Sequence, residues 1–241
     1  MSDKPEETSW QSWVRKTKYQ LSGRKSQANR YGDANWEATM LDAAQEGFLG
    51  NYDEALDALD EILQNTYERF DKEVRTDAFS AKANALEKLG RTDEALATFD
   101  KAIENSNKVA MTLSDLFCVD RHKSNFLNLV KNKLDITFAN EKEIISLINA
   151  TNFDEVISFS KNLKKLIIIT RSEKGAIAIN GNEVFECKAK SNLNIVDLTG
   201  AGDLFAAGFL HGHVNNLSVN NSLEKGTEMA SKIIQQIGAR L

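Results

Sequence analysis

The sequence predicts a two-part fold, in which all-α helical-hairpin repeats precede an α/β region with a mostly parallel sheet. Residues 50–60 and 90–100 resemble each other at an offset of 40 residues, and each belongs to an amphipathic helical pattern. After residue 107 the pattern changes to short apolar runs that alternate with helical segments, which is typical of a sheet covered on both faces by helices. Near the C-terminal end, a glycine turn leads into an amphipathic helix from Gly200.

The distribution of charge also divides the chain near residue 107. Residues 1–107 carry 21 acidic and 14 basic side chains, whereas residues 108–241 carry 14 acidic and 16 basic ones. We therefore expect a leader over residues 1–30, helical repeats over residues 31–107 and an α/β portion over the rest. We interpret the leader, which contains a cluster of six basic residues, as a solvated and partly disordered segment, with a nucleic-acid-binding arm as the alternative.

Composition argues against several classes of protein. A net charge of −5 does not fit a general nucleic-acid or anionic-membrane partner, and no apolar run approaches the roughly 20 residues of a membrane span. The N-terminus is charged and lacks the apolar core of a secretory signal, so we expect a cytoplasmic protein. Cys118 and Cys187 lie far apart in no C-x-x-C spacing, which indicates neither a disulfide framework nor a zinc site.

The helical segment contains two similar hairpins. In each, a glycine ends one helix, at Gly50 or Gly90, and an Asp-Glu pair begins the next. Small residues occupy matching positions in the two helices of each hairpin, where they let the helices approach closely: Ala43, Ala55, Ala83 and Ala95.

This pattern resembles the tetratricopeptide repeat. The resemblance implies a groove for a peptide or protein ligand, and a plain helical spacer is the alternative of equal weight. Two features depart from the repeat: the offset of 40 exceeds the usual period of about 34, and the proline expected after each unit is absent.

The α/β portion begins with strands separated by helices. Short apolar runs predict strands at residues 109–113, 135–139 and 166–170, and the Asn180-Gly181-Asn182 turn predicts a hairpin of residues 176–179 and 183–189. Helices are expected over residues 119–131, 141–149, 153–162 and 221–237, besides the one that follows the glycine turn.

The glycine turn has the chemistry of an anion-binding site. An apolar strand end, residues 194–196, precedes the run Asp-Leu-Thr-Gly-Ala-Gly-Asp at 197–203. Because Gly200, Ala201 and Gly202 carry little or no side chain, a phosphoryl group can approach the unpaired N–H groups of the helix N-terminus. Asp203 at the rim could accept the proton of an attacking hydroxyl. A turn that serves only packing is the alternative.

The same run resembles the second signature of the PfkB family of carbohydrate and nucleoside kinases, whose pattern reads roughly D-T-x-G-A-G-D. Leu198 stands where threonine is commoner in the family. The resemblance implies that Asp203 is the catalytic base and that the amides of Gly200, Ala201 and Gly202 form the anion hole.

Two further elements strengthen the resemblance. Asn140 and Glu143 match the family's N-x-x-E element, which implies that they help to order magnesium and phosphate through water, although a helix cap at Asn140 explains the pattern equally well. Thr170–Gly175 occupies the place of the T-x-G-x-x-G nucleotide loop, with Ser172 where the first glycine is usual. Thr170, Ser172 and Gly175 are therefore candidate ligands of ATP, and Ala230 belongs to a closing helix that resembles the one flanking the adenine.

The resemblance covers residues 108–241 and implies a partial ribokinase-like fold. It corresponds to the family's C-terminal, nucleotide-binding portion, so we expect the acceptor-binding half to be missing and the chain to be a fusion or a truncated product. Two hypotheses follow. The first is an ATP- and magnesium-dependent kinase, similar to adenosine kinase, that phosphorylates a hydroxyl of a sugar or nucleoside but is incomplete as encoded. The second is a non-catalytic interaction module of helical repeats fused to a kinase remnant.

Overall fold

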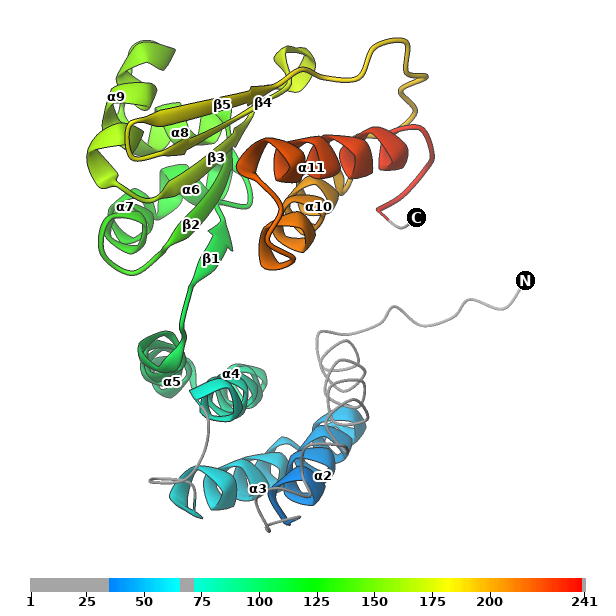
Figure 1. The fold of residues 1–241 in the computed structure, drawn as a ribbon. Helices are drawn as coiled ribbons and strands as arrows, with labels where there is room; N and C mark the ends of the chain where they lie inside the picture. The colour runs from blue at the N-terminus through cyan, green and yellow to red at the C-terminus, as the bar shows by residue number, and fades with distance from the viewer. Residues whose placement is uncertain (1–34, 66–71, 240–241) are drawn as a thin grey trace. The chain divides into compact units, whose positions relative to one another are not determined.

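The computed structural model describes residues 35–65 and 72–239. The chain divides into two compact units, with the boundary between Asn107 and Lys108 (Figure 1). The predicted leader, residues 1–30, lies outside the described residues.

The first unit contains helices α2 (Asn35–Leu49), α3 (Tyr52–Asn65), α4 (Lys72–Lys88) and α5 (Thr92–Asn105). Gly50 and Gly90 follow α2 and α4 with φ values of +86° and +73°, the left-handed conformation that commonly ends a helix. Each consecutive pair of these helices packs together, and the shared core includes Leu59 and Leu86. The four alanines expected between helices are at most 3% exposed.

The second unit is built on one five-stranded sheet in the order β1 (Ala110–Thr112), β2 (Ile136–Asn140), β3 (Leu166–Thr170), β4 (Ala176–Asn180) and β5 (Glu183–Cys187). The first three strands are parallel, whereas β3, β4 and β5 pair antiparallel. The prediction of a mostly parallel sheet is therefore corrected to a mixed one. Only five residues join β3 to β4, too few for the crossover that a parallel neighbour requires.

Helices cover both faces of this sheet. Side chains alternate along each strand, so that Ile167 and Ile169 pack toward α6 (Leu116–Arg121), α7 (Lys123–Asn132), α8 (Glu141–Ile148) and α9 (Phe153–Leu163). Phe138 and Ile168 form the core of the other face with α10 (Ala201–Val214) and α11 (Val219–Ile233). Figure 1 shows this last pair as an orange and red hairpin beside the sheet.

Two local predictions are wrong. The single helix expected over residues 119–131 is two helices, α6 and α7, because the chain leaves helical geometry at His122, where ψ is 29°. The apolar segment 194–196 is not a strand. The amides of Val196 and Asp197 instead donate to the carbonyl of Ile234, just after α11, at 2.8 and 3.3 Å.

Close packing of α10 on α11 depends on glycines. A Cβ atom at Gly208 would lie 2.7 Å from the Lys225 carbonyl oxygen, and one at Gly226 would lie 2.8 Å from the Phe205 carbonyl oxygen. Both distances are shorter than van der Waals contact, so neither position has room for a side chain. The short separation fixes how the start of α10 faces the C-terminal half of α11.

Candidate active site

A pocket of about 680 Å³ lies in the second unit, within the size range of small-molecule sites. Its walls come from the loop after β3, the first turns of α10, the C-terminal half of α11 and the irregular segment between β5 and α10. Most of the lining side chains are apolar or small. The pocket can therefore take a small molecule with a substantial apolar surface.

Six residues singled out from the sequence line this one pocket: Thr170, Ser172, Gly175, Ala201, Gly202 and Ala230. They come from three elements that are distant in the sequence, so their meeting in one pocket supports a shared binding role. Gly200 and Asp203, also predicted, flank the lining pair Ala201 and Gly202 in the chain, and the Asp203 side chain is exposed. Asn140 and Glu143 lie outside the lining.

The glycine turn ends in the N-cap of α10. Gly200 has φ +76° and no side chain that caps the helix, whereas a Cβ atom at Gly202 would meet only open space. Within the described part of the chain, the amides of Gly200, Gly202 and Asp203 have no backbone acceptor, while the Ala201 amide donates to the Leu198 carbonyl at 3.2 Å. The open N–H groups and the helix dipole favour an anion at this point.

Asp197 holds the turn in place. Its Oδ1 accepts hydrogen bonds from the amide and hydroxyl of Thr199 at 2.9 and 2.7 Å, and its Oδ2 accepts one from the Gly238 amide at 3.0 Å. The bond from Gly238, followed by those from Thr199, lowers the pKa of this carboxyl. The first aspartate of the signature is thus an anchor of the turn.

Asn140 and Glu143 form a capping box at the start of α8. The Asn140 side chain accepts a bond from the Glu143 amide at 2.9 Å, and Glu143 Oε2 accepts one from the Asn140 amide at 2.8 Å. Glu143 is only 4% exposed, and this burial raises its pKa despite the opposing bond from Asn140. The helix cap, one of the two readings of this pair, is therefore present.

The loop after β3 is a tight turn. The Arg171 amide donates to the Gly175 carbonyl at 2.7 Å, and the Gly175 amide donates to the Ser172 carbonyl at 3.0 Å. Ser172 adopts φ +52°, a left-handed conformation that costs a residue other than glycine free energy. At Gly175 a Cβ atom would lie 2.0 Å from the Cys187 carbonyl oxygen, so only glycine fits against β5.

Part of the pocket wall was not predicted from the sequence. Lys190, Asn192, Leu193 and Ile195 belong to an irregular segment without periodicity, so no pattern marks them as lining residues. On α10, on α11 and directly after α11, the additional wall residues are buried or half-buried and carried only the signal of an amphipathic face: Phe205, Thr227, Ser231 and Ile234.

Other candidate sites are less defined. The first unit has a pocket of about 470 Å³ whose charged lining includes the ion pairs Asp60–Lys82 and Arg91–Glu94. In each pair the two opposite charges offset one another. Across residues 35–65 and 72–239, no three His, Cys, Asp or Glu residues gather as a metal site, and no helix there is long and apolar enough to cross a membrane.

A model of the pfkB family of carbohydrate kinases matches residues 25–241. The chain belongs to this family. The PfkB match reaches well into the first unit, so the prediction that the resemblance is confined to residues 108–241 is too narrow. It also assigns residues 25–107 to the PfkB family, and the tetratricopeptide assignment of that region has no support from it.

Individual PfkB-like proteins agree with the family assignment. Adenosine kinase from Sinorhizobium meliloti is 36% identical with a TM-score of 0.57, over 64% of this chain and 46% of that one. A probable sugar kinase from Rhizobium etli is 33% identical with a TM-score of 0.58, over 71% and 54%. Cytidine kinase from Thermococcus kodakarensis is 29% identical over 118 residues, which are 48% of this chain and 42% of the relative. The chain thus spans about half the length of these proteins.

Proposed function

We propose that this chain binds ATP with magnesium in the pocket of the second unit and transfers the γ-phosphoryl group to a hydroxyl of a nucleoside. The observation that carries this proposal is the convergence of the Thr170–Gly175 loop, the start of α10 and the C-terminal half of α11 on one pocket. A mostly apolar wall suits an adenine ring, and the open amides of the glycine turn suit the phosphates.

In this proposal Asp203 is the general base. It lies exposed in the first turn of α10, next to Gly202, so a hydroxyl held there could give its proton to the carboxylate while it attacks the phosphorus atom. The amides of Gly200 and Gly202 would donate hydrogen bonds to the negative charge on the transferred group. Ala201 contributes less, because its amide is already bonded to Leu198.

Asn140 and Glu143 can hold magnesium only indirectly. Each carboxylate oxygen of Glu143 accepts a bond from Asn140 within the capping box, and a carboxylate oxygen has a further lone pair for a water molecule. Mg²⁺ commonly keeps several waters and binds largely through substrate phosphates, so this donor set fits it. The metal would supply charge neutralisation between the phosphates.

Two of the three relatives described above favour a nucleoside acceptor. Adenosine kinase and cytidine kinase are named for nucleoside substrates, whereas the Rhizobium etli protein is named a probable sugar kinase. The chain spans about half the length of these relatives, so the experiment compares acceptors of both classes. Ribose is the comparison substrate that represents the sugar class.

The test combines calorimetry with an assay of ADP release. We expect the chain to bind ATP with magnesium, and expect Asp203→Asn to keep that binding while the rate of acceptor-dependent ADP release falls by roughly 10²- to 10⁴-fold. Adenosine, cytidine and ribose are the acceptors to compare. No heat at millimolar ATP would refute the proposal and leave the non-catalytic interaction module. Binding without turnover by any of the three acceptors would leave a nucleotide-binding kinase remnant.

A further inference from the structure

Two segments of the site leave the sheet side by side. In the parallel pair β2 and β3, Asn140 is the register partner of Thr170, so Glu141 and Arg171 are the first residues beyond the two strand ends. Glu141 opens α8, and Arg171 opens the loop that contains the short 3-10 turn η2 (Ser172–Lys174). The start of α8 and the candidate nucleotide loop are therefore adjacent.

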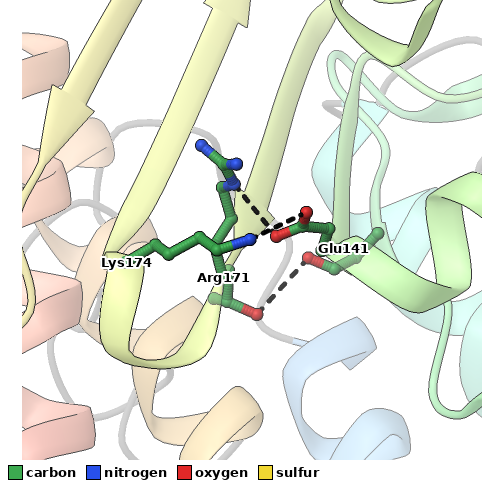
Figure 2. Close-up of polar contacts among 5 residues, drawn as sticks. Glu141, Arg171 and Lys174 are labelled. Carbon is green, nitrogen blue, oxygen red and sulfur yellow. Dashed lines mark hydrogen bonds and ion pairs between the residues drawn. The ribbon is translucent and has the colours of Figure 1, made fainter. Parts of the chain in front are cut away.

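The Glu141 carboxylate bonds to both cations of this loop, as Figure 2 shows. Its Oε2 accepts from Arg171 Nε at 3.1 Å, and its Oε1 accepts from Lys174 Nζ at 3.4 Å. The Glu141 and Arg171 side chains are 23% and 21% exposed, so solvent screens their pair less than a surface pair. Burial alone would raise the pKa of Glu141, but Arg171 and then Lys174 outweigh it and the pKa is lowered.

A second contact fixes Arg171 from another direction. The centre of its guanidinium lies 3.8 Å from the ring centroid of Phe153, the first residue of α9. This is a close cation–π arrangement, which favours the observed position of the guanidinium. Arg171 is thus held by an anion on α8 and by an aromatic ring on α9.

The other side of the same loop faces the pocket. Ser172 and Glu173 line the pocket, while their neighbours Arg171 and Lys174 are the residues bonded to Glu141. Ser172 holds φ +52°, where glycine is favoured. A serine there needs surrounding contacts to keep this conformation, and the bonds to the flanking cations are such contacts.

We propose that Glu141 is a positioning residue of the kinase site: by holding Arg171 and Lys174, it fixes the loop that presents Ser172 and Glu173 to the nucleotide. The effect of Glu141 on the loop is argued from the two ion pairs. The effect on ATP binding rests on the proposed function. Glu141 itself touches no nucleotide in this scheme, and its removal acts through the loop.

Hydrogen exchange on the nucleotide-free chain tests whether Glu141 holds the loop. In Glu141→Gln we expect faster exchange at the amides of Arg171, Lys174 and Gly175, which close the loop, with unchanged exchange in β3 and in α8 beyond its first turn. Glu141→Asp separates this effect from the helix dipole, since it keeps a charge at the start of α8 but is too short to reach both cations. It should behave like the glutamine variant. Unchanged loop exchange in both variants would overturn the proposal.

Calorimetry and kinetics with ATP and magnesium test whether the held loop strengthens ATP binding. We expect Glu141→Gln to raise the Kd and KM for ATP about three- to tenfold, with kcat within about twofold and an unchanged urea midpoint. Combining it with Arg171→Gln should add little to either single change, because both break the same contact. Glu94→Gln, which breaks a Glu–Arg pair in the first unit, is the matched control and should change neither Kd nor loop exchange.

The outcomes separate the two proposals. A loosened loop in a chain that binds no ATP would refute the proposed function and leave Glu141 as a purely structural holder of the loop. A loosened loop with unchanged or tighter ATP binding would refute the positioning role, because the released cations would then serve the phosphates directly.

Discussion

Gly200 and Gly202 of the signature turn are expected to be required for different reasons. Gly200 has a positive φ, and an added Cβ atom would lie 2.8 Å from the Ala239 Cβ, so its requirement is conformational. Gly202 has ordinary helical geometry and open space where a side chain would be. The absence of a side chain at Gly202 therefore leaves room for a phosphate group to approach the open amides.

Alanine at each position should separate these reasons. Gly202→Ala should leave the free energy of unfolding unchanged or raise it by up to about 1 kcal/mol, because alanine favours the helix. It should weaken ATP binding about tenfold, or about 1.4 kcal/mol, by blocking the open amides. Gly200→Ala should instead destabilise the fold by roughly 1–2 kcal/mol or more. Urea titration and calorimetry measure both, and equal effects of the two variants on stability would contradict this division.

The residues of the site differ in how far the sequence could predict them. Gly200 to Asp203 are recognisable because they match a whole signature run, and Gly175 because it matches the last glycine of the nucleotide-loop pattern. Asp197 was recognisable as part of the signature, but its role as an anchor depends on Gly238, distant in the chain. Ile195 was expected in a strand end but lies in an irregular segment, so its place in the pocket wall was not predicted.

At the scale of elements, strand and helix periodicity predicted most of the second unit. The predicted strand 166–170 is β3, and the Asn-Gly-Asn turn joins β4 to β5 as expected. The break between α6 and α7 was missed because neither proline nor glycine occurs near His122. The antiparallel β4–β5 hairpin was predicted, but the antiparallel pairing of β3 with β4 was not. The short link between β3 and β4 was interpreted as a nucleotide loop, and what its length requires of the strand direction was not considered.

The start of α8 gives a prediction about pH. Because burial raises the folded-state pKa of Glu143, the folded chain binds a proton there more tightly than the unfolded chain does. The stabilising contribution is complete below the unfolded value of about 4.5 and is lost as the pH rises through the folded pKa. Glu143→Gln removes this titration and keeps a cap, since glutamine also closes a capping box.

We therefore expect the glutamine variant to match the natural chain near pH 4 and to be more stable at neutral pH. The difference should grow by at most about 1.4 kcal/mol per pH unit between the two pKa values. Unfolding midpoints from pH 4 to 8 measure it. A variant that loses magnesium-dependent ATP affinity without losing stability would support the metal role as well as the cap.

At the scale of the molecule, the two units have separate cores. One hydrophobic cluster belongs to α2–α5, and two others lie on the faces of the sheet, with no residue in common. The change of hydrophobic pattern and of charge near residue 107 lies at the boundary between these units. The family assignment of residues 25–107 could not be anticipated, because a helical hairpin pattern is shared by many unrelated proteins.

Separate cores predict a selective response to ligand. Differential scanning calorimetry should resolve two transitions, and ATP with magnesium should shift only the one that belongs to the second unit. At a ligand concentration 100-fold above Kd the stabilisation should be about 2.7 kcal/mol. A single transition, or an equal shift of both, would show that the units unfold together.

The hydrogen bonds of Asp197 have a mechanical consequence. By joining the turn before α10 to Gly238 beyond α11, this side chain closes the helical hairpin into a ring at its open end. Tight glycine packing already joins the two helices along their length. Both connections oppose separation of α10 from α11, so we expect the pocket walls that these helices contribute to move together when a nucleotide enters.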